Sequence, residues 1–290
     1  LFAGDTLSLM ASVAGGLPLS YIWELNGSPI AGAVNANYTL PNVQAINSGA
    51  YSLTVSNAFG IVTSATVFVH VTRQLDSPYP ANVLNLRPLA YWRLDETNGN
   101  VAFDYVGTNS GTYANVVLGQ PGYGSTPPVQ SDPNELAALF GPTNSYVSIP
   151  TIDLSVPNGG NGEFAIAAWV NASANVGAGA GIVAKGYGGG DEQFALDCGG
   201  PGNAFRFFVH DAAGNVYPIA SSVVPDNHWH WLVGVCDQVN SNVTLYVDGT
   251  NAAQGTIRAG SGIHASAVPA SIGAREGGLD QPYNLQLLGK

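Results

Sequence analysis

The stretch from Trp229 to Gly249, WHWLVGVCDQVNSNVTLYVDG, constrains the fold more than any other part of the chain. Every second residue from Trp229 to Val235 is large and apolar, and the same holds from Val243 to Val247. Alternate side chains share one face of a β-strand, and the residues Asn-Ser-Asn at 240–242 favour a turn. The stretch therefore predicts two antiparallel strands joined by a tight polar turn, as in the wall of a β-sandwich.

The composition of the 290 residues fits an all-β protein with two domains. Hydrophobic residues make up 46% of the chain, which can fill two cores, and 37 glycines and 18 prolines supply turns. Charged residues make up only 9%, against about 25% in ordinary soluble proteins. Solubility must then come from Asn, Ser and Thr. Since this composition is typical of extracellular proteins, we expect a secreted or cell-surface location.

The formal net charge is −11, and residues 1–72 contain neither Lys nor Arg. Without a basic stripe the chain cannot screen phosphates, so we expect no nucleic-acid partner and no attraction to anionic membranes. No run of about 18 apolar residues is present, so we also expect no membrane insertion. Because the sequence lacks an initiator Met, we expect it to be part of a longer protein.

Residues 1–72 show the pattern of a small β-sandwich, with alternating runs separated by turn residues. The runs are Thr6–Val13, Tyr21–Leu25, Asn37–Leu40, Ala50–Ser56 and Ile61–Val71. The segment LSYIWELNGSPI (19–30) resembles the immunoglobulin strand that carries the core Trp, here Trp23. The segment SGAYSLTVSNAFG (48–60) resembles the end of such a domain, with Tyr51 as its tyrosine corner.

The resemblance to an immunoglobulin-like domain also implies what its core contains. The two family cysteines would fall at Ala11 and Leu53, so packing must replace the disulfide. We therefore expect Trp23 to be buried beside these two residues. This domain holds no candidate catalytic constellation. It is interpreted as a spacer, and the alternative is recognition of protein or glycan through its loops.

Three prolines in residues 73–88 predict a short, semi-rigid connection, because Pro fixes φ and favours extended backbone. The predicted organisation is therefore an immunoglobulin-like domain at 1–72, a linker at 73–85 and a second domain at 86–290.

The second domain resembles the laminin G-like family, a concanavalin A-like jelly-roll β-sandwich. The matching segments, besides the hairpin, are LAYWRLDETNGN (89–100), GEFAIAAWVNAS (162–173) and ASIGAREGG (270–278). In that family a further strand follows the last segment and pairs with the opening strand. Here the sequence reads only LLGK at 287–290, so we expect a strand from outside residues 1–290 to pair with residues 89–95.

Catalysis and zinc binding have little support in the sequence. Glycoside hydrolysis needs two facing carboxylates roughly 5–10 Å apart. Asp191, Glu192 and Asp197 come closest, but they do not alternate along one strand face, so we predict no enzyme. His228 and His230 share a strand face and could bind zinc, yet no third ligand is evident nearby.

Calcium is implied by the laminin G-like resemblance. The family's loop pattern matches AFDYVGTNSG (102–111), which carries the carboxylate ligand onto Asp104 and carbonyl ligands onto the loop through Gly107. The alternative is that Asp104 caps a turn.

Carbohydrate binding would need exposed aromatic rings, because a flat apolar face with a hydroxyl group suits stacking on sugars. The candidates are Tyr105, Tyr113, Tyr123, Tyr187 and Tyr217. The alternative for each is a half-buried position at the rim of the sandwich.

The two cysteines, Cys198 and Cys236, allow two interpretations. They are either small buried apolar residues or a disulfide between neighbouring strands.

Together these observations predict a non-catalytic extracellular adhesion or carbohydrate-binding module of a larger secreted bacterial protein. Its partner would be a glycan or cell-surface polymer. The alternative is a structural subunit that pairs strands with copies of itself in an extracellular filament or sheath.

Overall fold

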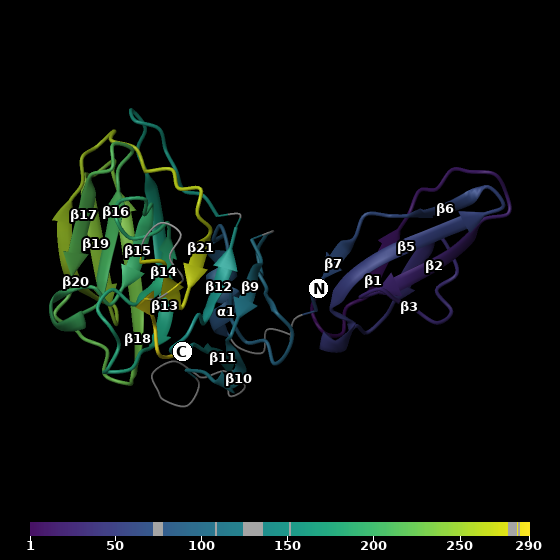
Figure 1. Ribbon diagram of the computed structural model, residues 1–290, viewed down its shortest axis with the longest axis horizontal. Helices are drawn as coiled ribbons and strands as arrows, with labels where there is room; N and C mark the ends of the chain where they lie inside the picture. The colour runs from purple at the N-terminus through teal and green to yellow at the C-terminus, as the bar shows by residue number, and fades with distance from the viewer. Residues whose placement is uncertain (72–77, 108, 124–135, 151, 278–282, 284) are drawn as a thin grey trace. The chain divides into compact units, whose positions relative to one another are not determined.

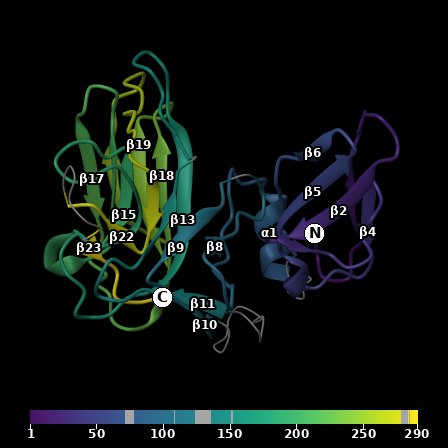
Figure 2. The same ribbon diagram turned by 45° about the vertical axis from the view of Figure 1, so that its right-hand side comes forward.

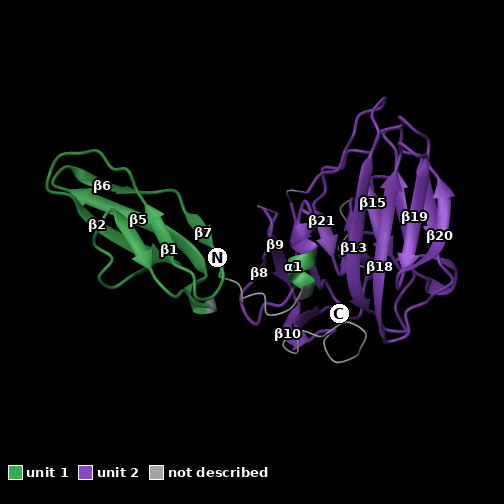
Figure 3. Ribbon diagram, turned by 180° about the vertical axis from the view of Figure 1, so that it is seen from behind, with its two compact units in different colours: residues 1–82 green, residues 83–290 purple. Residues whose placement is uncertain are grey.

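The computed structural model describes residues 1–71, 78–107, 109–123, 136–150, 152–277, 283 and 285–290. Nearly all of its regular structure is β-strand, which confirms the predicted all-β class. The chain forms two compact units, Leu1–Asn82 and Val83–Lys290 (Figure 3). Among the described residues, no helix has the length and apolar character that crossing a membrane requires.

The first unit consists of two small sheets (Figure 1). Its strands are β1 (Leu7–Met10), β2 (Ser20–Leu25), β3 (Ser28–Pro29), β4 (Asn37–Leu40), β5 (Gly49–Asn57), β6 (Gly60–Thr63) and β7 (Val67–Val69), with a 3-10 helix at Ala45–Asn47. One sheet pairs β1 with β4. The other has the order β3-β2-β5-β6, and β7 also pairs with β5. These strands overlap the five runs that the sequence predicts and extend at most one residue beyond them, apart from the short β3.

The core of the first unit forms around Trp23, whose side chain is only 5% exposed. It packs in one cluster with Leu53, and the partly buried Ala11 lies against that cluster, as expected. The indole Nε1 donates a hydrogen bond to the carbonyl of Asn35 at 3.0 Å. The Tyr51 hydroxyl donates to a backbone carbonyl four residues upstream at 2.8 Å. Trp23 and Tyr51 therefore take the positions that the sequence predicts.

Helix α1 (Pro78–Asn85) occupies most of the segment predicted as an extended linker. That prediction is wrong for this part, because Pro78 and Pro80 lie in the first turn of the helix. There the missing N–H of proline costs no intrahelical hydrogen bond, and its φ already suits a helix. The division of the chain into two compact units falls inside this helix, between Asn82 and Val83.

The second unit contains two facing sheets (Figures 1 and 2). The eight-stranded sheet has the order β17-β16-β15-β14-β21-β12-β9-β8. Its strands are β8 (Val101–Ala102), β9 (Gly111–Ala114), β12 (Tyr146–Ile149), β14 (Gly181–Lys185), β15 (Phe194–Asp197), β16 (Arg206–His210), β17 (Val216–Ala220) and β21 (Ala270–Ile272). The four-stranded sheet has the order β13-β18-β19-β20, made of β13 (Glu163–Asn171), β18 (Trp229–Asp237), β19 (Asn242–Val247) and β20 (Thr250–Thr256).

Two small pairs complete the second unit. They are β10 (Val117–Pro121) with β11 (Leu136–Leu139), and β22 (Ala274–Arg275) with β23 (Leu285–Gln286).

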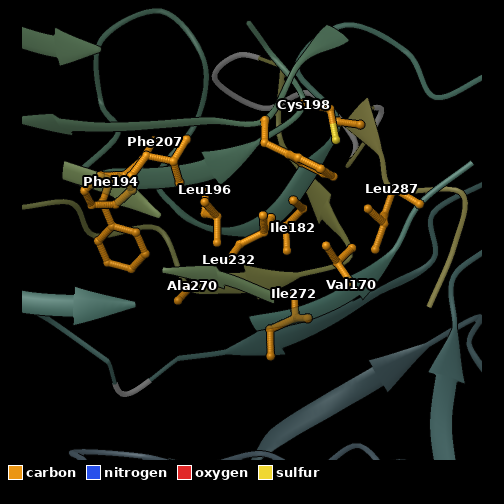
Figure 4. Packing of buried hydrophobic residues seen from close by; sticks show 14 of the residues in the cluster. Val170, Ile182, Phe194, Leu196, Cys198, Phe207, Leu232, Ala270, Ile272 and Leu287 are labelled. Atoms are coloured by element: carbon orange, nitrogen blue, oxygen red, sulfur yellow. The ribbon is translucent and has the colours of Figure 1, made fainter. Parts of the chain in front are cut away.

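A single core fills the space between the two large sheets (Figure 4). Leu196 and Phe207 enter it from the eight-stranded sheet, and Val170 and Leu232 enter it from the four-stranded sheet. All four side chains are fully buried. This packing fixes the strand faces, because a slip of one residue would turn every inward side chain outward.

The predicted hairpin is confirmed as β18 and β19, which pair from Leu232 with Val247 to Asp237 with Asn242. Its inward side chains on β18 begin with His230 and Leu232, which are buried. The larger apolar residues at the alternate positions of β18 therefore face away from the core. Strand β18 is therefore apolar on both faces, and its outward face carries part of the candidate site.

The C-terminal residues lie against two other segments of the second unit. Gly289 forms single bridges with Phe140, which follows β11, and with Ala172, which follows β13. Within 89–95 the described residues form one bridge with the same chain, between Trp92 and Asp104. A single bridge does not fill a strand edge, so the pairing of this segment with an outside strand stays a prediction.

Candidate functional site

Four aromatic side chains gather outside the four-stranded sheet, and we call them the aromatic patch: Tyr123, Trp169, Trp229 and Trp231. Trp169 on β13 lies directly opposite Trp231 on β18 in the strand ladder. Trp229 precedes Trp231 by two residues and so shares its face. Tyr123 comes two residues after the end of β10. Residues distant in sequence therefore meet on one outward face.

The rings of the aromatic patch are in direct contact. Tyr123 stacks on Trp169 with ring centroids 4.0 Å apart and an interplanar angle of 17°. The Trp169 and Trp231 centroids are 5.2 Å apart, and the Trp229 ring meets Tyr123 edge-on at 6.2 Å. All four side chains are half-buried. Such rings form a rigid apolar surface, which binds a flat apolar partner at little entropic cost.

The outward face of the four-stranded sheet, which we call the outer face, carries small and branched apolar residues in its middle and acidic residues at its far end. Ala165 and Ala167 on β13 are exposed, and Val235 and Val233 lie opposite them on β18. At the end away from the aromatic patch the ladder pairs Glu163 with Asp237. The outer face thus runs from aromatic, through small and branched apolar residues, to two carboxylates.

The tyrosines predicted as ligand contacts do not form one site. Tyr123 belongs to the aromatic patch. Tyr217 is half-buried, and its hydroxyl donates to Asp211 at 2.9 Å. Tyr187 is half-buried and bridges Glu276.

The hydroxyl groups of Tyr105 and Tyr113 donate hydrogen bonds to two adjacent acidic residues instead. The Tyr113 hydroxyl donates to Glu96 at 2.6 Å, and the Tyr105 hydroxyl donates to Asp95 at 2.9 Å. Burial, together with the adjacent carboxylates, raises the pKa of both phenols well above the usual range. Burial also raises the pKa of the Glu96 carboxyl. These hydroxyls are committed to internal hydrogen bonds, which makes a structural role the better interpretation.

The Asp104 carboxylate accepts hydrogen bonds from its own loop and from the segment before it. Its Oδ1 accepts hydrogen bonds from the backbone N–H groups of Tyr91 and Val106. Its Oδ2 accepts from the backbone N–H groups of Gly107 and Asn109 and from the Asn109 side-chain amide. Five N–H donors surround the carboxylate where calcium would require oxygen ligands. The described geometry therefore fits the alternative interpretation, in which Asp104 caps the 104–109 turn.

Two of the three acids considered for hydrolysis, Glu192 and Asp197, are paired with arginines. Arg206 contacts Asp197 through two hydrogen bonds of 2.9 and 2.6 Å. Arg275 donates to Glu192 at 2.9 Å and lies 3.7 Å from Asp197. Asp191 accepts a hydrogen bond of 2.6 Å from the Ser266 hydroxyl. These acids therefore do not form a free pair of facing carboxylates.

The histidines considered for zinc take part in a carboxylate network. His230 lies between Asp248 at 2.8 Å and Asp226 at 3.2 Å. His228 lies 3.2 Å from the same Asp226 oxygen and is largely exposed. Within the part of the chain that the structure describes, no group of three or more His, Cys, Asp or Glu residues has a geometry that could hold a metal ion.

Cys198 and Cys236 are free and buried in the main core, so the disulfide interpretation does not hold. Burial raises the pKa of each thiol to about 12, with a smaller contribution from the neighbouring aspartate. They pack as small apolar side chains, which is the other interpretation of the sequence.

The three tryptophans of the aromatic patch were not among the predicted ligand-binding residues, although the sequence contains a signal for them. In β18 the alternate set that begins at Trp229 and the set that contains Leu232 are both apolar. A strand with one buried face needs only one such set. The second apolar set, which begins at Trp229, therefore indicated an apolar surface on the outward face of this strand.

Comparisons with known proteins agree with the fold of the second unit. Residues 141–287 match the model of the concanavalin A-like lectin/glucanases superfamily. A decoration protein of Escherichia phage T5 is 36% identical over 64 residues, which are 22% of this chain and 39% of that protein. The chain thus spans well under half the length of this curated relative.

Two solved structures align along almost the whole chain. A putative carbohydrate binding protein from Bacteroides ovatus has a TM-score of 0.35 and 14% identity, and the alignment covers 100% of this chain and 76% of that one. Domains LG4-5 of the mouse laminin alpha1 chain give a TM-score of 0.33 and 10% identity, covering 98% and 79% of the two chains.

Proposed function

Because this chain belongs to the concanavalin A-like lectin/glucanases superfamily, we propose that its second unit binds carbohydrate without cleaving it, through the aromatic patch. The observation that carries the proposal is the contact between Tyr123, Trp169 and Trp231 on an outward sheet face. A pyranose ring presents C–H groups on its flat faces, and aromatic rings stack against them while the hydroxyl groups stay hydrated.

The positions of the charged groups in the second unit support binding without catalysis. The Asp197 and Glu192 carboxylates are held by arginines, as described above. A hydrolase of this kind needs one carboxylic acid and one free carboxylate across the scissile bond.

Loss of binding on a single substitution tests the proposal. The purified chain is applied to a glycan array with calcium and again with a chelator. Trp231→Ala is expected to abolish binding, whereas Tyr187→Ala removes a half-buried ring outside the patch and is expected to leave binding intact. Equal binding by Trp231→Ala and the unaltered chain, with both folded by circular dichroism, would rule out this site.

We further propose an extracellular adhesion module of a larger secreted bacterial protein as the setting for this binding. In that setting the first unit is an immunoglobulin-like spacer, supported by the burial of Trp23 and the Tyr51 hydrogen bond. Calcium stays a prediction for the second unit. The N–H groups around Asp104 argue against it, and the chelator arm of the glycan array tests it.

The alternative function, a subunit that assembles with copies of itself, is favoured by strand β6. All four of its residues are exposed, and Ile61 and Val62 are each 72% exposed. Among the described strands, β6 pairs only with β5, so its other edge is open. An uncharged apolar edge is a template for strand pairing. Light scattering across a concentration series tests it, and Val62→Lys would abolish any assembly seen.

A further inference from the structure

The acidic end of the outer face has an arrangement that lowers stability. Glu163 and Asp237 are direct cross-strand neighbours on β13 and β18. Like charges in such positions repel each other, which destabilises a sheet. Hydrogen bonds from the Asn240 side chain and backbone hold the pKa of Asp237 below its usual value, so this carboxylate is ionised at neutral pH. The outer face therefore ends in a fixed negative charge.

Several basic groups of the second unit are already engaged by internal partners. Arg206, Arg275 and Arg93 each contact a carboxylate of the same unit. The Lys185 ammonium donates to the Val268 carbonyl at 2.9 Å.

Lys290 lies beside the aromatic patch, since its backbone pairs with Asn171 at the end of β13. Its ammonium donates to the Pro121 carbonyl at 3.0 Å. An anionic ligand stacked on the patch could reach this ammonium, but its continuation along the outer face would meet Glu163 and Asp237, which would repel it.

We propose that the ligand of the outer face is an uncharged polysaccharide, and that Glu163 and Asp237 exclude anionic polysaccharides from it. This inference rests on the proposed carbohydrate function. A long ligand stacked on the aromatic patch continues over Ala167 and Ala165, whose small side chains leave room, and reaches the two carboxylates. Hydroxyl groups can accept or donate hydrogen bonds there, whereas sulfate or carboxylate groups meet the like charge of Glu163 and Asp237.

Matched polymers that differ only in charge test this directly. Hydroxyethyl cellulose is compared with carboxymethyl cellulose, and dextran with dextran sulfate, by affinity electrophoresis and calorimetry at low and at physiological ionic strength. The neutral member of the preferred pair is expected to bind roughly tenfold more tightly. This ratio should shrink as salt screens the carboxylates.

The variant Glu163→Gln/Asp237→Asn is expected to gain affinity for the anionic polymer and to keep its affinity for the neutral one. The control Asp5→Asn/Glu24→Gln removes the same number of charges from the first unit and should change neither affinity. If the unaltered chain binds the anionic polymer equally well and Trp231→Ala abolishes that binding, the proposed function stands and this inference fails. If it binds none of the four polymers, the inference fails, and the glycan array with Trp231→Ala decides the proposed function separately.

Discussion

Gly234 on β18 provides a sharp test of how the two sheets of the second unit pack. A Cβ added at this position would lie 2.4, 2.5 and 2.8 Å from three ring atoms of Phe207, which is fully buried on the opposite sheet. Carbon atoms pack at about 3.5–4.0 Å, so the ring would have to move by about 1 Å. Overpacking of this kind costs about 1–3 kcal/mol.

The net effect of Gly234→Ala also includes the unfolded chain. Replacing Gly by Ala reduces the entropy of the unfolded state, which offsets about 0.4–1 kcal/mol of that cost. We therefore expect a net loss of about 1–2 kcal/mol. For a unit of this size, the calorimetric transition of the second unit should fall by about 2–8 °C.

Two further variants separate the steric cause from other effects. Gly141→Ala is the matched control, because a Cβ there meets no atom within 4 Å. Its melting temperature should stay the same or rise slightly. Phe207→Leu/Gly234→Ala should recover part of the loss from Phe207→Leu alone, giving a coupling energy in a double-mutant cycle. A melting temperature for Gly234→Ala equal to that of the unaltered chain would refute the packing argument.

Four further predictions concern other parts of the chain. Cys198 and Cys236 should not react with Ellman's reagent at about pH 8 in the native state, because burial holds the pKa of both thiols near 12. Both should react in denaturant, and failure of the two thiols to react after unfolding would indicate a disulfide. Burial raises the pKa of Glu96 in the folded state, so its contribution to the free energy of unfolding is fully present below the unfolded pKa of about 4.3 and is lost as the pH rises through the folded pKa. Glu96→Gln should therefore reduce the fall in melting temperature between these two pKa values, and an unchanged dependence of melting temperature on pH would contradict this. Asp104→Ala should cost about 2–4 kcal/mol because five N–H donors lose their acceptor. If calcium is also bound, chelator lowers the melting temperature of the unaltered chain, and an unchanged melting temperature leaves Asp104 as a turn cap alone. Trp23→Ala should lower the free energy of unfolding of the first unit by about 3–5 kcal/mol, because Trp23 is buried in its core. Calorimetry should show this loss in a transition separate from that of the second unit, and a small loss would mean that Trp23 is not central to that core.

Strand periodicity predicted most of the architecture, because alternation reports directly which side chains share a face. The hairpin at Trp229–Gly249 follows from it. Helix α1 was missed because two prolines in eight residues suggest extended backbone, and only their place in the first turn makes them compatible with a helix.

The candidate site was predictable only in part, because a ring's environment depends on contacts between distant strands. Tyr123 was named from its residue type, but Tyr113 was named on the same ground and is buried against Glu96. The stacking of Tyr123 on Trp169 joins residues from two separate strand pairs. Sequence spacing within a single strand carries no information about such a contact.

The position of β21 has a consequence for how the protein is made. This strand, Ala270–Ile272, pairs with β14 on one side and β12 on the other, and it joins the two halves of the eight-stranded sheet. During synthesis at about 5–20 residues per second, β12 and β14 leave the ribosome several seconds before their shared partner. In that interval a nascent chain exposes two strand edges that can pair with other molecules. The second unit must therefore complete its central sheet late, and interrupted translation before Ala270 would yield aggregation-prone fragments.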